Sequence, residues 1–141
     1  MSKLSPGQQE FKLSPKHGFR SGSSDVGIGY ETGAGGSVTQ GAGRTTGVTL
    51  NTITGAITTD TASLAAEATA DFTVTNSTVA IGDTVVLSMR SGSNSGGTLI
   101  NVITVAAGSF GIRVHNGNAA GGTAETGAII INFAVIKAVS S

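Results

Sequence analysis

The sequence predicts an all-β fold, a β-sandwich or jelly-roll-like barrel of about seven or eight antiparallel strands with an extended N-terminal arm. Glycine occupies 22 of the 141 positions, about twice its usual share of ~7%. Threonine and serine add 19 and 16 residues, and these residue types favour strands and turns over helices. Short β-type segments also recur at the ~8–12-residue spacing typical of a sandwich or barrel.

The first segment, residues 1–24, is expected to be the arm, and residues 25–141 the β-sandwich domain. Both prolines lie in this segment, where Lys3-Leu4-Ser5-Pro6 recurs as Lys12-Leu13-Ser14-Pro15. Because proline biases the residue before it toward an extended conformation, the repeat favours two similar docking points. A disordered basic tail with a chance repeat is the alternative interpretation.

The charge of the chain is divided between these two parts. The net charge is zero, but four basic residues and one acidic residue give the first twenty residues a charge of +3 and leave the rest at −3. A mildly acidic body with few aromatic rings does not favour nucleic acid as a partner. The longest apolar stretch has about 13 residues, fewer than the ~20 of a membrane-spanning helix, so no membrane partner is expected. No secretory signal is recognised, and synthesis and use without export are expected.

The segments after the arm alternate between turns and strands. Residues 21–43 are rich in glycine and serine and are expected to mix turns with short edge strands. A helix of one or two turns is expected at Thr61–Glu67, because Asp60 or Thr61 could cap it. Alternation of apolar and polar residues gives several of the strands one buried face. The expected strands are residues 47–50, 56–58, 70–76, 84–90, 99–105, 109–115 and 128–139.

The last predicted strand is apolar on both faces. An exposed two-sided apolar strand would be prone to aggregation, so this strand is expected to be central in its sheet or to lie where subunits meet. We favour an oligomer interface, although a central strand of a monomer accounts for the same pattern. The interface residues would be Ile129, Ile130, Ile131, Phe133, Val135 and Ile136.

The sequence offers little for catalysis or for binding a cofactor. It has no cysteine and two histidines, His17 and His115, so no metal site is expected. The glycines near Gly27 and Gly33 are not followed by the Gly-Lys-Ser/Thr of a phosphate-binding loop. No nucleophile elbow or close pair of acids is apparent. We therefore expect no catalytic residues, no cofactor and no enzymatic activity.

Several segments resemble one known family. They are Gly29–Gln40 (GYETGAGGSVTQ), Arg44–Asn51 (RTTGVTLN), Gly55–Thr58 (GAIT), Ala70–Ser77 (ADFTVTNS) and Asn132–Lys137 (NFAVIK). The chain resembles small Gly/Thr-rich β proteins of tailed-bacteriophage virions over roughly residues 29–139. Related sequences occur as stand-alone proteins and as modules of fibre-like proteins, so the resemblance implies a structural role. It carries over no catalytic residues, and the arm lies outside it.

Together, the resemblance and the residues predict a capsid decoration, or cement, protein. It would be made in the host cytoplasm and would sit on the exterior of the virion capsid as a homo-oligomer, with a trimer favoured. Apolar residues of the arm would bury surface on the major capsid protein while basic residues meet its acidic groups. The residues expected to bind are Lys3, Leu4, Phe11, Lys12, Leu13, Lys16, Phe19 and Arg20. A tail-fibre or receptor-binding (adhesin) module of the virion is the alternative.

Overall fold

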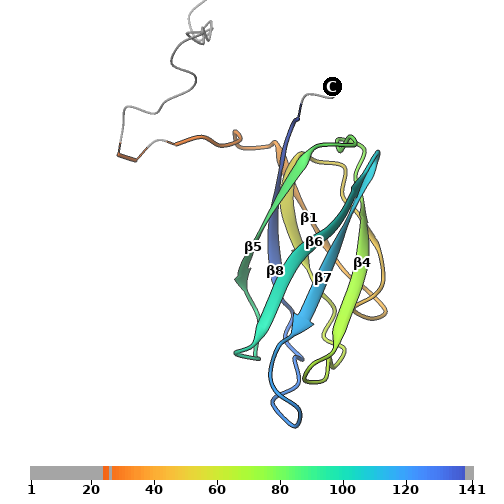
Figure 1. Cartoon of the computed structure of the whole chain (residues 1–141). Helices are drawn as coiled ribbons and strands as arrows, with labels where there is room; N and C mark the ends of the chain where they lie inside the picture. Colours follow the sequence, from red (N-terminus) through yellow and green to blue (C-terminus); the bar gives the residue numbers. More distant parts are fainter. Residues whose placement is uncertain (1–23, 26, 139–141) are drawn as a thin grey trace, which may run out of the picture.

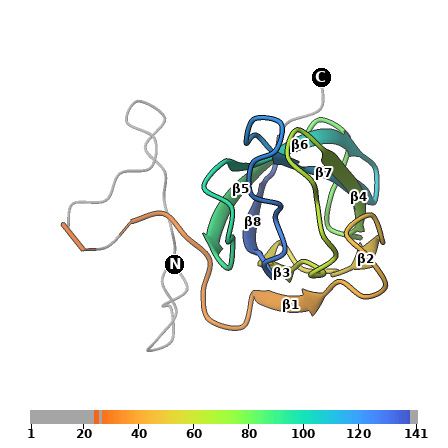
Figure 2. The same ribbon diagram turned by 90° about the horizontal axis from the view of Figure 1, so that it is seen from below.

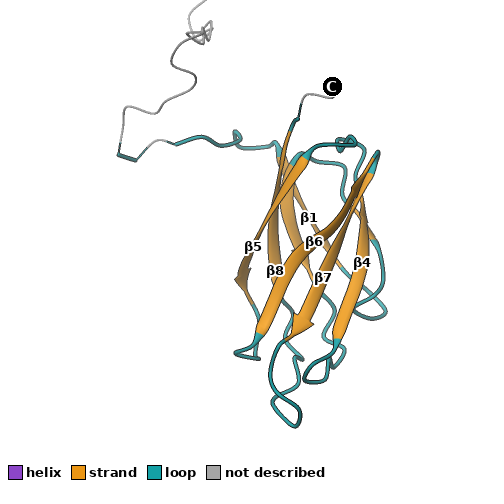
Figure 3. Ribbon diagram, in the orientation of Figure 1, coloured by secondary structure: helices purple, strands orange, loops and turns teal. Residues whose placement is uncertain are grey.

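The computed structural model describes residues 24–25 and 27–138, and this part of the chain is a two-layer β-sandwich without helices (Figures 1 and 3). One sheet has the order β1-β3-β8-β5 and the other the order β2-β4-β7-β6. Viewed along the strands, the two sheets enclose one interior (Figure 2). The strands are β1 Gly35–Thr39, β2 Val48–Thr49, β3 Thr54–Thr58, β4 Thr69–Thr75, β5 Thr84–Ser91, β6 Thr98–Ala106, β7 Ser109–Asn116 and β8 Ile130–Ile136.

The all-β class and the sandwich are therefore confirmed. The predicted division into an arm at residues 1–24 and a domain at 25–141 stays a prediction, because residues 1–23, 26 and 139–141 lie outside the described residues. The eight arm residues expected to bind the capsid also fall there. The expected short edge strand in the glycine-rich stretch is β1, which borders only β3.

The path of the chain differs from the expected purely antiparallel arrangement. Consecutive strands lie in opposite sheets except for the hairpin of β6 and β7. Each connection over an end of the sandwich reverses the direction of the chain. After one strand in the opposite sheet, the chain therefore returns to the first sheet in its original direction. For this reason β1 and β3 pair in parallel, as do β2 and β4, whereas the remaining strand pairs are antiparallel.

The core forms from alternate residues of the facing strands. In β4, Phe72 and Val74 are buried, and Thr73 and Thr75 are exposed, which confirms the pattern predicted from the sequence. The Phe110 and Phe133 rings come from opposite sheets and their centroids are 5.3 Å apart. Contacts of this kind, together with the burial of aliphatic side chains, hold the layers together.

Strand β8 is central, between β3 and β5, and this corrects the predicted oligomer interface. Its buried side chains fill the interior of the sandwich, so they are not available to a second subunit. Of the six predicted interface residues, only Ile130, which is half-buried, and Ile136, which is exposed, face outward. The four residues that the prediction misplaced at an interface are Ile129, Ile131, Phe133 and Val135, each no more than 2% exposed.

The predicted helix at Thr61–Glu67 is wrong. Leu64 forms an isolated antiparallel bridge with Glu125, in which each residue's N–H donates to the other's carbonyl at 2.9 Å. The Leu64 side chain is buried at the same time. The segment satisfies its backbone across the end of the sandwich instead of within a helical turn.

Two connections pass each other in very close contact at Gly92 and Gly127. A Cβ atom on Gly92 would lie 1.9 Å from the Ala128 carbonyl oxygen, and one on Gly127 would lie 1.8 Å from the Gly92 carbonyl oxygen. Gly92 also has a φ of +93°, a conformation that other residues adopt only with strain. Both positions therefore require glycine.

We expect Gly92→Ala to lower the free energy of unfolding by about 3 kcal/mol or more, since the added methyl group overlaps backbone. The matched control is Gly96→Ala in the same connection, where a Cβ would meet nothing within 4 Å, and we expect it to change stability by less than about 1 kcal/mol. Urea unfolding measures both variants. Equal midpoints for the two variants would contradict the close approach.

Candidate docking surface

The two ends of the sandwich differ in chemistry. At one end, which we call the Glu125 end, lie the connections that follow β1, β3, β5 and β7. The opposite end, the Tyr30 end, is where residues 28–30 approach the sandwich and where β8 finishes. Each end holds one group of residues that could serve a function.

Glu125 is a fully buried acid at the Glu125 end. No cation forms an ion pair with it among the described residues. Its carboxylate instead accepts hydrogen bonds from hydroxyl and backbone N–H groups of two connections and of the first residue of β6. The donors are the hydroxyls of Ser93 and Thr98 and the backbone N–H groups of Asn94, Ser95 and Gly127.

These hydrogen bonds set the ionisation of Glu125. Burial by itself raises the pKa of a carboxyl group, because it penalises the charged form. Here the donors, with Ser93 and Thr98 first, outweigh burial and lower the pKa of Glu125 from 4.5 to about 2. The side chain is therefore an anion at neutral pH, with neither the raised pKa nor the open access of a general acid.

Arg44, only 4% exposed, is the buried cation of the same end. Its guanidinium donates to the carbonyl oxygens of Ala62, Glu125 and Gly127 and to the Thr59 hydroxyl. Burial lowers the pKa of Arg44, and the negative charges of Glu125 and Asp60 partly oppose this. The donors of Arg44 are taken up by the connections themselves, so this network closes the sandwich and offers no ligand site.

The Tyr30 end carries an apolar groove. Its volume is about 550 Å³, within the range of ligand-sized pockets. Among the exposed large hydrophobic residues of the described chain, Ile28, Tyr30, Val86 and Ile136 gather here, with 81%, 44%, 48% and 56% exposure. The groove is lined by Ile28, Gly29, Tyr30, Val86, Ala134, Ile136 and Lys137.

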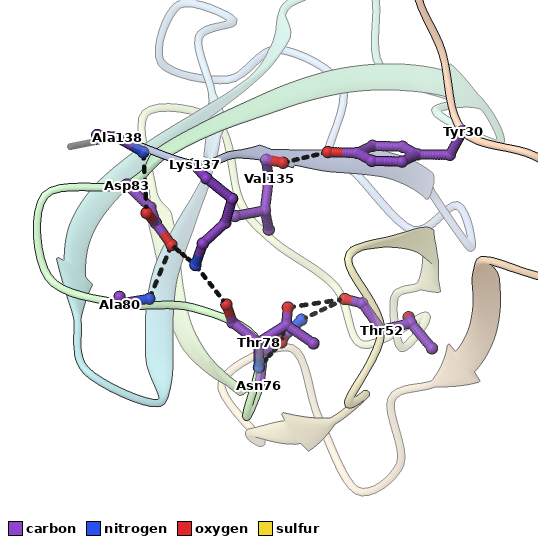
Figure 4. A network of polar contacts seen from close by, with 9 residues as sticks. All are labelled: Tyr30, Thr52, Asn76, Thr78, Ala80, Asp83, Val135, Lys137 and Ala138. Carbon is purple, nitrogen blue, oxygen red and sulfur yellow. Dashed lines mark hydrogen bonds and ion pairs between the residues drawn. The ribbon is translucent and has the colours of Figure 1, made fainter. Parts of the chain in front are cut away.

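The floor of this groove is the outer face of β5 and β8, and its wall is the segment leading into β1. The last paired residues of β3 and β8 are Thr54 and Ala134. Beyond them, the backbone N–H of Val135 donates to the Ile53 carbonyl oxygen. The Tyr30 hydroxyl donates to the Val135 carbonyl oxygen (Figure 4). Tyr30 thereby satisfies a carbonyl group at the end of β8 and fixes the wall beside the floor.

The rim of the groove is held by an ion pair between Lys137 and Asp83 (Figure 4). The Lys137 ammonium also donates to the Thr78 carbonyl oxygen at 2.7 Å. Hydrogen bonds from Lys137 and from the Ala80 backbone lower the pKa of Asp83. With its charge directed to Asp83, Lys137 presents its aliphatic stem to the groove, so the lining is apolar.

Of the predicted functional residues that the structure describes, only Ile136 lines this groove. Ile28, Tyr30 and Val86 were not predicted to belong to it. The run Val85-Val86-Leu87 was an available signal, because three consecutive apolar residues in a strand leave one on the outer face. Nothing local in the sequence indicates that Tyr30 reaches β8, since 105 positions separate its partners.

Other charged or polar groups of the described residues do not assemble into a site. Asp71 and Arg113 form an exposed ion pair at 2.7 Å on the opposite sheet. The Nδ1 atom of His115 is buried without a hydrogen-bond partner. Within residues 24–25 and 27–138 no three potential metal ligands lie together, and no helix there has the length and apolar character to cross a bilayer.

Comparison of the chain with protein-family models, with curated proteins and with solved structures gave no match.

We expect Glu125→Gln to destabilise the protein by about 3 kcal/mol at neutral pH, because an amide NH₂ group would face the donors that now bind a carboxylate. The folded-state pKa of about 2 lies below the ordinary 4.5, so the stabilisation by ionised Glu125 is complete above pH 4.5. It is lost as the pH falls toward about 2.

Urea unfolding of both proteins between pH 6 and pH 2 measures this effect, and the difference between them should shrink with falling pH. Taking the difference removes the contribution of Asp71 and Asp83, whose pKa values are also lowered. The exposed Glu31 provides the control Glu31→Gln. A difference that stays constant over this pH range would disprove the assignment to Glu125.

Proposed function

We propose that the protein is a structural protein of a bacteriophage virion. It acts as a capsid decoration protein that binds the major capsid protein through residues 1–24 and stabilises the head as a homotrimer. The observation that carries this proposal is the apolar groove at the Tyr30 end, where the segment leading from the basic arm joins the sandwich. The described residues that follow the arm in sequence, Ile28 to Tyr30, line this groove.

The arm composition supports binding to a protein surface. Leu4, Phe11, Leu13 and Phe19 supply apolar area, and at ~25 cal/mol per Å² a few hundred Å² buried contributes several kcal/mol before ordering costs. The basic residues of the arm, which carries +3 over residues 1–20, would meet acidic groups of the capsid. Linking several arms in one oligomer multiplies the binding, because each further arm binds intramolecularly.

The outer face of the β1-β3-β8-β5 sheet supports contact with other protein surfaces. Among the outward-facing residues of its four strands, Arg90 alone is charged. The outer face of the other sheet carries Asp71, Arg113 and His115. A face with a single charged residue and with apolar residues at one end is typical of a protein interface.

The alternative is a tail-fibre or receptor-binding module, in which the arm anchors the protein in the tail and the loops contact a receptor. Images of particles with and without the protein distinguish the two roles. Many copies spread over the head would support decoration. A few copies confined to the tail would overturn it in favour of the alternative.

Deleting residues 1–20 should weaken binding to purified heads at least about a hundredfold, since several kcal/mol of apolar and ionic contact would be lost. The sandwich should keep its stability, because all its strands and its core lie after residue 34. Cosedimentation with heads measures binding, and urea unfolding provides the control. Unchanged occupancy of the truncated protein would argue against attachment through the arm.

Double substitution Lys12→Glu and Lys16→Glu should weaken binding at least about tenfold in 50 mM salt, and much less in 1 M salt where the Debye length is ~3 Å. Arg113→Glu, at an exposed ion pair on the opposite sheet, is the control for charge reversal outside the arm. The measurement is cosedimentation across the salt range. If the double variant bound as tightly as the wild type in low salt, the ionic part of the mechanism would be refuted.

A further inference from the structure

The groove at the Tyr30 end is an unpartnered apolar surface. The other exposed large hydrophobic residues of the described chain are Ile81, Leu99 and Ile103, and they lie outside the groove. Single exposed apolar residues are normal, whereas four around one hollow indicate a binding surface.

The shape of the groove favours an occupant that inserts side chains. Residues 28–30 stand beside the outer face of β8, and the hydrogen bond from Tyr30 to Val135 fixes them there. A flat sheet face from a second molecule would meet this wall before it reached the floor. A chain segment with protruding phenylalanine or leucine side chains enters such a hollow without that obstruction.

The chain itself supplies such a segment where the described structure ends. Residues 1–23 hold Leu4, Phe11, Leu13 and Phe19, and Phe19 precedes Ile28 by only nine positions. Nine extended residues span about 30 Å, and Gly22 with its neighbouring serines permits a turn back toward the groove. A tether this short gives an effective concentration in the millimolar range, so even a weak contact would be populated.

We propose that, in the free protein, residues 1–23 fold back and place Phe19, with Leu13 beside it, in the groove of the same molecule. The groove then binds the apolar side chains of this segment within the same molecule. It shields these side chains from water when no other surface covers them. This inference concerns the unattached protein and does not depend on the proposed capsid role.

Limited trypsin digestion of the full chain tests the proposal, because Lys12, Lys16 and Arg20 are cleavage sites inside the segment. Mass spectrometry gives the cleavage rate at each site. A docked segment is cleaved only in its undocked fraction, so Val86→Glu combined with Ile136→Glu should raise these rates about tenfold. The matched control is Leu99→Glu on the opposite sheet, at a residue of similar exposure, 61%, and it should leave them unchanged.

A second variant, Leu13→Ser with Phe19→Ser, tests the other side of the contact without altering the sandwich. It should raise the cleavage rate at Arg20 to the same extent. Urea unfolding should show that the stability of the sandwich is unchanged. Loss of protection from trypsin in both double variants, to an extent that does not depend on protein concentration, supports the proposal. Equal cleavage rates in the wild type and both double variants would overturn it. So would protection that grows with protein concentration, because the groove would then be an interface between copies.

Discussion

The winding of the chain between two sheets imposes the constraint on which the rest of this structure depends. Six of the seven connections between consecutive strands cross from one sheet to the other. Each crossing runs over an end of the sandwich and carries backbone groups that no strand pairs. Because buried unpaired groups cost free energy, the crossings need polar side chains that bind backbone in the interior. In the part of the chain that the structure describes, the buried polar residues all lie in connections or at strand ends, namely Gln40, Arg44, Thr59, Asn76, Asp83, Ser95, Asn116 and Glu125.

Two of these residues show how the requirement is met. Asn116, fully buried at the end of β7, donates from its side chain to the carbonyl oxygens of Leu64 and Thr123. The backbone carbonyl oxygen of Asn116 accepts a hydrogen bond from the Glu67 backbone N–H. Asn76 at the other end donates to Thr52 (Figure 4). One amide side chain thus ties together connections that are far apart in sequence. The buried charges Arg44 and Glu125 extend this principle, since the hydrogen-bond partners of each are neutral hydroxyl and backbone groups.

The local features of this fold could be predicted from the sequence, and the long-range ones could not. Alternation at Phe72 and Val74 identified β4 and its buried face because strand periodicity is a property of neighbouring residues. The two-sided apolar pattern of β8 was interpreted as an interface in preference to a central strand. Burial by β3 and β5 and burial by a subunit leave the same pattern, so the sequence could not decide between them. The helix at Thr61–Glu67 was predicted from local capping, which the pairing of Leu64 with Glu125 overrode. The parallel pairs and the groove depend on contacts between distant segments, on which periodicity carries no information.

The same constraint explains why attachment and stability are separated in this molecule. At the Glu125 end the donors and acceptors of the buried charges are occupied by the connections, so a ligand there would have to break the contacts that close the sandwich. At the Tyr30 end β8 extends past β3, and Tyr30 alone covers the carbonyl of Val135. Outward residues of β8 there, Ala134 and Ile136, serve no part of the core, because the adjacent Phe133 and Val135 already fill it. Changes to this outer face therefore cost the fold little, which makes it the part of the sandwich where a binding surface can exist without weakening the structure that presents it.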